Sequence, residues 1–163
     1  MTSCMHIELT RLTEIDTSYI IELMNHPLVR RQMPLLQGSF SESDCQRFVA
    51  AKEQLWATHG YGPWAFVIED RFAGWGGLQP EGDEVDLALV LHPDYWGMGK
   101  ALYKEIIHRA FNEMGMESVT VLFPPSRTRI KGFLRLGFKK DKEVEMGEER
   151  FIRYRLENPN KGL

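Results

Sequence analysis

The strongest constraint on the fold is a strand, a glycine turn, a helix and a second strand that follow one another within residues 85–123. Residues 85–91 form a nearly continuous apolar run that only Asp86 interrupts, which is typical of a central strand covered on both faces. The turn at residues 97–99 leads into a helix with apolar positions four residues apart, and residues 118–123 form the next buried strand. Two consecutive strands joined by a helix run parallel. The sequence therefore predicts a parallel strand pair.

The flanking segments predict antiparallel strands and helices. Period-two alternation predicts a strand at residues 7–12 and hairpins at 64–79 and 138–156. Cap residues and stop signals predict three more helices, from Asp16 to His26, from Ser41 to Gly60 and from Pro124 to Gly137. Tyr19 and Leu134 are expected among the residues that face inward from these helices. We expect one α/β domain over residues 1–163, with a mixed, mostly antiparallel sheet around a central parallel unit and helices on both faces.

Composition limits the possible partners. The 163 residues are 43% hydrophobic and 26% charged, as in globular proteins, and the net charge of -3 argues against a nucleic-acid partner. No segment approaches the roughly 18 apolar residues of a membrane span. The two cysteines, Cys4 and Cys45, form neither a disulfide framework nor a metal motif. We therefore expect a cytoplasmic protein, monomeric or homodimeric, without metal or membrane association.

Residues 96–101 have the features of a phosphate-binding turn. The N–H groups and dipole of the following helix favour an anion, Gly97 and Gly99 permit close approach, and Lys100 adds a positive charge. The Walker A spacing fails because Ala101 stands where Ser or Thr is needed, and the dinucleotide fingerprint fails at Leu102. The plain alternative is that the glycines only make a tight turn.

This segment resembles the acyl-CoA loop of the GNAT superfamily of N-acetyltransferases. The family pattern Gln/Arg-x-x-Gly-x-Gly/Ala has its small residues at Gly99 and Ala101, whereas Trp96 departs from the first slot. A Trp-Gly-x-Gly run after a strand and a Pro is similar to the Rim-type branch, which acetylates ribosomal-protein N-termini. The run Leu136-Gly137-Phe138 is similar to the family's Leu-Gly-Phe signature.

The resemblance implies a site for acetyl-CoA. The backbone of Leu89, Val90 and Leu91 would bind the pantetheine arm and thioester as an added strand does. The pyrophosphate would be held by the loop residues Trp96, Gly97, Met98, Gly99, Lys100 and Ala101. Residues 127–142 carry seven basic residues against one acidic residue, which form a solvated helix face and hairpin edge or place one or two partners near the 3'-phosphate. Ser126 and Phe133 occupy the family's further cofactor-side positions, where Asn and the proton-donating Tyr are frequent.

Catalysis of acetyl transfer needs a base more than an acid. An alkyl ammonium is only about one part in a thousand free amine at pH 7, whereas a thiolate with a pKa near 8.5 leaves without much help. Asp86 is the first candidate base because an acid inside an apolar strand is costly unless it is used. Glu84 is the second, and His92 at the strand end is a weaker candidate. The alternative is that Asp86 faces solvent or pairs with a base.

We expect acetyl transfer from acetyl-CoA to a primary amine, by direct attack in a ternary complex. The amine would be a protein N-terminus or a small molecule. Because Phe133 cannot donate a proton, the competing hypothesis is an acyl-CoA-binding regulatory module with little or no turnover. A nucleotide-binding domain is a further alternative, which the failed motif spacings disfavour.

Overall fold

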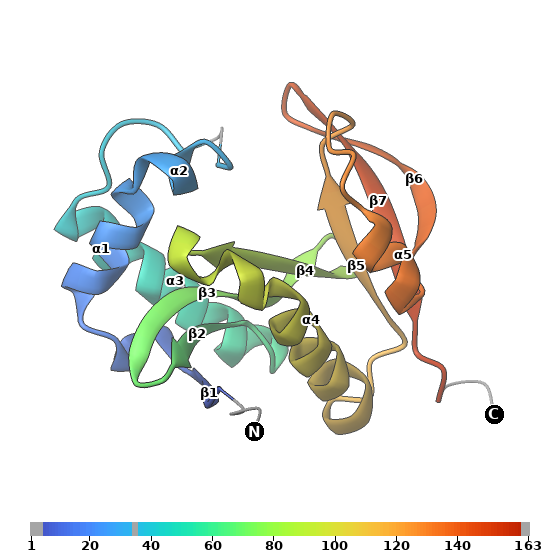
Figure 1. Cartoon of the computed structure of the whole chain (residues 1–163), viewed down its shortest axis with the longest axis horizontal. Helices are drawn as coiled ribbons and strands as arrows, with labels where there is room; N and C mark the ends of the chain where they lie inside the picture. Colours follow the sequence, from blue (N-terminus) through green and yellow to red (C-terminus); the bar gives the residue numbers. More distant parts are fainter. Residues whose placement is uncertain (1–4, 34–35, 161–163) are drawn as a thin grey trace. The chain divides into compact units, whose positions relative to one another are not determined.

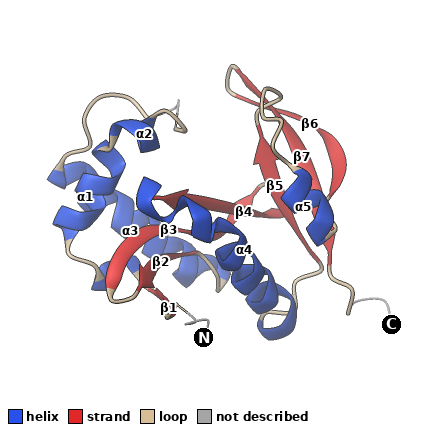
Figure 2. Cartoon of the chain, in the orientation of Figure 1, coloured by secondary structure: helices blue, strands red, loops and turns tan. Residues whose placement is uncertain are grey.

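The computed structural model describes residues 5–33 and 36–160 and consists of one mixed sheet with helices (Figures 1 and 2). Seven strands are hydrogen-bonded in the order β1-β2-β3-β4-β5-β7-β6. Their bounds are β1 Ile7–Thr10, β2 Pro63–Ile68, β3 Arg71–Glu81, β4 Glu84–Leu91, β5 Ser118–Phe123, β6 Lys139–Met146 and β7 Glu149–Glu157. Strands β4 and β5 pair in parallel, and the ladders β1–β2, β2–β3, β5–β7 and β6–β7 are antiparallel. The predicted mixed sheet with its parallel pair is confirmed.

Five α-helices connect these strands. They are α1 Thr17–Asn25, α2 Pro27–Arg30, α3 Glu42–His59, α4 Gly99–His108 and α5 Lys131–Leu136. Short 3-10 helices cover Leu12–Glu14 and Pro93–Met98, and one π-helical turn at Arg109–Glu113 extends α4. None of the helices in the described ranges is both long and apolar enough to cross a membrane.

The chain forms two compact units that are interleaved along the sequence. One comprises Met1–Gly77 and Leu89–Gly99, and the other comprises Leu78–Ala88 and Lys100–Leu163. Because β3 and β4 each begin in one unit and end in the other, neither unit corresponds to a continuous piece of chain.

The core of the first unit lies between its helices and the β2–β3 hairpin. Ile20, Leu23 and Cys45 from α1 and α3 pack with Ala65 and Trp75 of the hairpin, and all five are buried. The start of α3 is fixed by the predicted capping box, in which the Ser41 and Asp44 side chains each accept a hydrogen bond from the other residue's backbone N–H.

The core of the second unit centres on Phe133. Its ring contacts the rings of Tyr103 on α4, Phe123 on β5 and Phe138, with centroids 4.7, 4.7 and 5.7 Å away. These edge-to-face contacts hold α4 and α5 on the same face of β5. Gly137, with a φ of 109°, ends α5 in the left-handed conformation. The sequence predicted this end, because a glycine follows the last apolar residue of the helix.

Several local predictions were wrong. Tyr19 is 57% exposed and Leu134 is 47% exposed, although both were expected to face inward. The last helix begins at Lys131 because residues 124–130 form turns and irregular backbone before it. The short helix α2, with Pro27 as its first residue, was not predicted because the proline was interpreted only as a stop signal.

Candidate active site

The end of β4 exposes backbone groups that β3 does not use. The His92 N–H donates to the Ala73 carbonyl at 2.8 Å, so His92 points its backbone toward β3. Because successive residues of a strand point their backbone groups to opposite sides, those of Val90 also face β3 and those of Leu89 and Leu91 face away from it. Of the three residues expected to bind pantetheine, Leu89 and Leu91 therefore carry the groups that face away from β3, and the Leu91 carbonyl is already used by Trp96.

Gly74 confirms this orientation. A Cβ on Gly74 would lie 2.1 Å from the Val90 carbonyl oxygen, which is far inside contact distance. The absence of a side chain at Gly74 is what lets β3 approach β4 this closely.

The loop after β4 is a 3-10 helix that runs directly into α4. Its first turn is capped by His92, whose Nδ1 accepts a hydrogen bond from the Asp94 N–H at 3.1 Å. The Trp96 indole N–H donates to the Leu91 carbonyl at 2.9 Å, although the residue is 43% exposed. Trp96 thus fastens the loop to the end of β4, and His92 serves as a cap.

Gly97 and Gly99 are not required by the turn itself. Neither has a positive φ. A Cβ on Gly97 would meet nothing within 4 Å, and one on Gly99 would meet only Leu91 Cδ1 at 4.0 Å. The glycines therefore keep space open over the first turn of α4, where helical N–H groups lack intrahelical partners. This argues against the interpretation that they only make a tight turn, and it suits the approach of a pyrophosphate.

The other residues expected on the cofactor side differ in accessibility. Lys100 and Ala101 are exposed in the first turn of α4, Met98 is half-buried, and Ser126 is exposed in the turn after β5. Phe133 is only 7% exposed, so it acts mainly as a core residue. One or two of the seven basic residues within 127–142 were predicted near the 3'-phosphate, and one of the seven, Arg127, stacks over the Phe123 ring at 4.2 Å.

Asp86 lies at the one point where β4 and β5 pair. Asp86 and Thr120 form the single register pair of this parallel ladder within the described residues. The Thr120 hydroxyl donates to Asp86 Oδ1 at 3.0 Å. Burial raises the pKa of Asp86 from its ordinary 3.8 to about 7, against the lowering effect of the Thr120 hydrogen bond. At neutral pH the carboxyl group is thus poised between its acid and base forms.

Glu84 is engaged in a different way. Both of its carboxylate oxygens accept hydrogen bonds from Arg155, at 2.7 and 2.8 Å. These bonds lower the pKa of Glu84 and hold its charge. Glu84 is therefore a weaker base than Asp86.

Tyr103 is the tyrosine nearest to the position at which the family pattern has a proton donor. Its ring packs against Phe133, and burial raises the pKa of its hydroxyl to about 12. Such a phenol lies more than about three pKa units above a thiol. It cannot efficiently protonate a departing thiolate.

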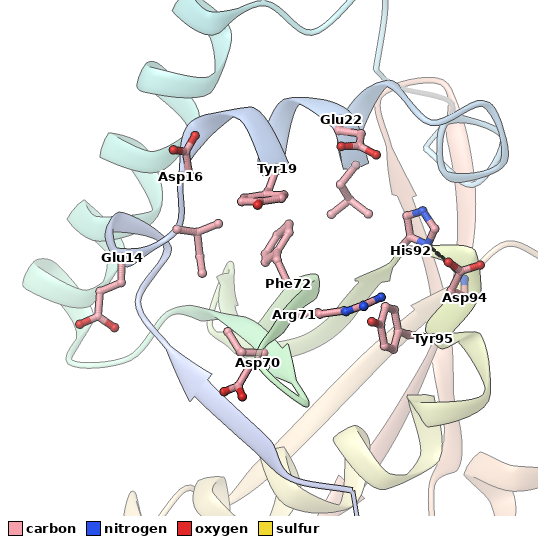
Figure 3. A pocket seen from close by; sticks show the side chains of 13 residues that line it. Glu14, Asp16, Tyr19, Glu22, Asp70, Arg71, Phe72, His92, Asp94 and Tyr95 are labelled. Atoms are coloured by element: carbon pink, nitrogen blue, oxygen red, sulfur yellow. Dashed lines mark hydrogen bonds and ion pairs between the residues drawn. The ribbon is translucent and has the colours of Figure 1, made fainter.

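A pocket of about 560 Å³ lies beside the loop, within the first unit (Figure 3). Tyr19 and Phe72 face each other inside it, and Arg71 extends toward Tyr95. Five carboxylate residues line it: Glu14, Asp16, Glu22, Asp70 and Asp94. Since this excess of negative charge opposes phosphate groups, we do not assign the pyrophosphate to this pocket.

Cysteine and metal chemistry find little support in the described residues. Cys45 is buried in the first core, and burial raises the pKa of its thiol. Cys4 lies outside the described residues. No group of three or more His, Cys, Asp or Glu side chains within residues 5–33 and 36–160 is arranged to hold a metal ion.

The family profile described as Acetyltransferase (GNAT) domain matches residues 6–139. The chain belongs to this GNAT family. By family it is an acyltransferase, and the fold expected from the resemblance is confirmed. No curated protein sequence matches it significantly.

Solved structures share the GNAT fold at low identity. The GNAT-family acetyltransferase from Bacillus anthracis is 15% identical with a TM-score of 0.73, covering 93% of this chain and 95% of that one. The Campylobacter jejuni N-acetyltransferase PseH, in complex with acetyl coenzyme A, is 18% identical with a TM-score of 0.66 and coverages of 93% and 99%. The ribosomal-protein-S5-alanine acetyltransferase from Vibrio fischeri is 14% identical with a TM-score of 0.68 and coverages of 98% and 96%.

Three polar residues around Asp86 were not predicted from the sequence, namely Thr120 on β5 and Arg153 and Arg155 on β7. Thr120 is fully buried within an otherwise apolar stretch, and that polar interruption was a usable signal. Arg153 and Arg155 alternate with apolar residues on β7 and looked like an ordinary solvated strand face. Their neighbours depend on strand order, which the sequence does not reveal.

Proposed function

We propose that this GNAT protein is an N-acetyltransferase that transfers an acetyl group from acetyl-CoA to a primary amine. The observation that carries the proposal is the loop at Gly97 and Gly99, where neither the backbone nor packing requires glycine and the space over the α4 N-terminus is open. The proposal covers residues 1–163 as one domain, in the cytoplasm, as a monomer or homodimer.

The residues present suit acetyl-CoA as co-substrate. The backbone groups of Leu89 and the N–H of Leu91 would bind the pantetheine amides, and the first turn of α4 with Lys100 would bind the pyrophosphate. The thioester supplies an activated acetyl group with a good leaving group. Trp96 keeps the loop against β4 through its bond to the Leu91 carbonyl.

Asp86 is the proposed general base. With a pKa of about 7, the carboxylate is a stronger base than an ordinary aspartate, and a large fraction of it is still unprotonated at neutral pH. It can therefore accept a proton from the ammonium group. Thr120 orients the carboxyl group through its hydrogen bond to Oδ1. Glu84 is the reserve candidate, and its ion pair with Arg155 makes it the poorer one.

The thiolate would leave without a dedicated acid. Phe133 has no proton to donate, and the raised pKa of Tyr103, about 12, keeps its proton on the phenol. A thiolate with a pKa near 8.5 is a tolerable leaving group for attack by an amine. We propose direct attack in a ternary complex, because the buried Cys45 is unsuited to a covalent intermediate.

The proposed acceptor is a primary amine of one of two kinds. A protein N-terminus is one possibility, and the ribosomal-protein-S5-alanine acetyltransferase from Vibrio fischeri has the same fold. A small-molecule amine is the other possibility. The alternative function, an acyl-CoA-binding module with little or no turnover, is favoured by Phe133 and Ser126, which stand where the family often has Tyr and Asn.

Release of free CoA thiol from acetyl-CoA, measured across a panel of amines, tests the proposal. We expect amine-dependent thiol release and an acetylated amine as product. Acetyl-CoA should also raise the melting temperature, while ATP and NADH should do so much less. Equal stabilisation by ATP and CoA would refute the acyl-CoA site, and stabilisation by CoA without turnover on any amine would favour the regulatory module.

A further inference from the structure

Two arginines on one face of β7 have opposite surroundings. Arg155 donates hydrogen bonds to Glu84, Asp141 and the Ser118 hydroxyl. Arg153, two residues earlier on the same face, has no hydrogen bond or ion pair from its side chain to any described residue. The sheet gives Arg155 hydrogen-bonded partners, whereas Arg153 acts on the carboxylates of Glu84 and Asp86 only through its charge and forms no direct pair with either.

The isolation of Arg153 is not the result of solvent exposure. The residue is 7% exposed, and its Nε is sealed from solvent without a hydrogen-bond partner. Its register neighbour on β6 is Lys142, which adds positive charge. A buried charge without a partner is destabilising and is normally paired or hydrogen-bonded. A missing anionic group is the simplest compensation.

The strand register places Arg153 on the face that carries the proposed base. Asp86 pairs with Thr120, and Thr120 pairs with Arg155, so these side chains share one face of the sheet. Arg153 pairs with Leu122, one alternation further toward the carboxyl end of β5. This is also the direction in which β4 continues from Asp86. The charge of Arg153 acts on Asp86 and opposes the raising effect of burial on its pKa.

We propose that Arg153 binds a carboxylate of the acceptor, and that the acceptor is an amine with a carboxylate near the reacting nitrogen, as in an α-amino acid. The inference rests on the proposed function. A guanidinium pairs with a carboxylate through two parallel hydrogen bonds, while Asp86 receives the proton of the ammonium group. Glu84 does not compete, because Arg155 already binds it. A protein N-terminus carries an amide in place of the carboxylate, and a simple polyamine carries no anion.

The test compares α-amino acids with their α-carboxamides in the thiol-release assay, using the twenty common side chains. We expect kcat/KM of the wild type to favour the best amino acid over its amide by at least about 30-fold. Arg153→Gln should abolish this preference, because it should slow the amino acid by at least about 30-fold more than it slows the amide. Arg153→Lys should keep part of the preference, because it retains the charge without the fork.

Arg150→Gln is the matched control. It removes a β7 arginine whose side chain is 62% exposed, and its selectivity should equal that of the wild type. Equal rates for amino acids and amides in the wild type would overturn the inference while leaving the acetyltransferase proposal intact. An equal loss on both substrates in Arg153→Gln, with a shifted pH profile, would instead assign Arg153 to tuning Asp86.

Absence of turnover on every amine would refute the proposed function. Thermal shifts measured with CoA present would then test the carboxylate site independently of catalysis. Stabilisation by amino acids, lost with amides and in Arg153→Gln, would support the carboxylate site. Equal shifts for both substrate classes would overturn it.

Discussion

The carboxyl group of Asp86 is costly to the fold in its charged form and useful to the reaction in that same form. Thr120 supplies one hydrogen bond, which does not offset burial, and the pKa remains near 7. A purely structural carboxyl group in a strand would more often be paired, as Glu84 is with Arg155. The difference between these two neighbours on β4 singles out Asp86 as the proposed base.

Replacing Asp86 by Asn should remove the proton acceptor while keeping its size and the hydrogen bond from Thr120. We expect kcat to fall about 100-fold at pH 7 with CoA affinity unchanged. Wild-type kcat/KM should rise with pH through about 7, the pKa of Asp86, as this carboxyl group loses its proton. The deficit of the variant should shrink at high pH, where free amine is plentiful.

Steady-state kinetics from about pH 5.5 to about pH 10, a range that spans the pKa of Asp86 and reaches that of an alkyl ammonium, check this prediction together with calorimetry for CoA. Glu84→Gln is the control, because it alters the same strand at a carboxylate held by Arg155. A variant Asp86→Asn within about twofold of the wild type at neutral pH would exclude Asp86 as the base.

Tyr103→Phe tests whether a tyrosine replaces the missing proton donor. The phenol, with a pKa raised to about 12, is too weak an acid to matter, and its ring contact with Phe133 survives the change. We expect kcat to change by less than about threefold, against the 10²-fold or more of typical general acid–base catalysis. A larger loss, measured with the melting temperature unchanged, would restore Tyr103 as a donor.

At the scale of the elements, the loop into α4 combines a fixed and an open part. Trp96 and His92 fix its first turn through hydrogen bonds to Leu91 and Asp94. Gly99 at the start of α4 has open space around its missing Cβ, apart from a contact at 4.0 Å. A side chain there should therefore disturb a bound ligand far more than the fold.

Gly99→Asp should abolish measurable CoA binding while the protein stays folded. The carboxylate would occupy the space proposed for the pyrophosphate and repel it. Gly147→Asp in the turn between β6 and β7 is the control, since a Cβ there meets nothing within 4 Å and Asp tolerates the φ of 64° at this position. Circular dichroism checks the fold and calorimetry checks the affinity. Unchanged CoA affinity in Gly99→Asp would show that the loop is only a turn.

Elements with strong local signals were predictable and those set by packing were not. The capping box at Ser41 and the left-handed stop at Gly137 depend on neighbouring residues, so the sequence indicated both. The outward direction of Tyr19 and Leu134 depends on which face of a short helix meets the sheet. Apolar spacing alone does not decide this in helices of fewer than about three turns.

At the scale of the whole molecule, the order of elements along the sequence predicted the parallel strand pair. The contacts around Asp86 depend instead on the order of the strands within the sheet. A helix between two strands predicts that β4 and β5 run parallel, and they do. The insertion of β7 between β5 and β6 is what brings Arg153 and Arg155 onto the face of Asp86. Nothing local in residues 149–157 predicts that insertion, so Asp86 could be named from the sequence and its surroundings could not.

The buried carboxyl group also predicts how the stability of the whole protein depends on pH. The pKa of Asp86 is about 7 in the folded protein and ordinarily 3.8, so between these values the folded state holds a proton that the unfolded state has lost. The free energy of unfolding contributed by this group therefore falls as pH rises from about 4 to 7 and levels off above, by at most about 4 kcal/mol.

Asp86→Asn cannot ionise at this position, so its free energy of unfolding relative to the wild type should increase over the same pH range and stay constant above it. Urea denaturation of both proteins from pH 4.5 to 8.5 (a window of roughly four units set by the linkage relation) measures this difference directly. Other titrating groups are common to both proteins and cancel. A variant less stable than the wild type at pH 8, or a difference that does not change with pH, would show that the carboxyl group is not desolvated. We expect a variant that is more stable and less active than the wild type, because a base in an apolar strand lowers stability and contributes to the reaction.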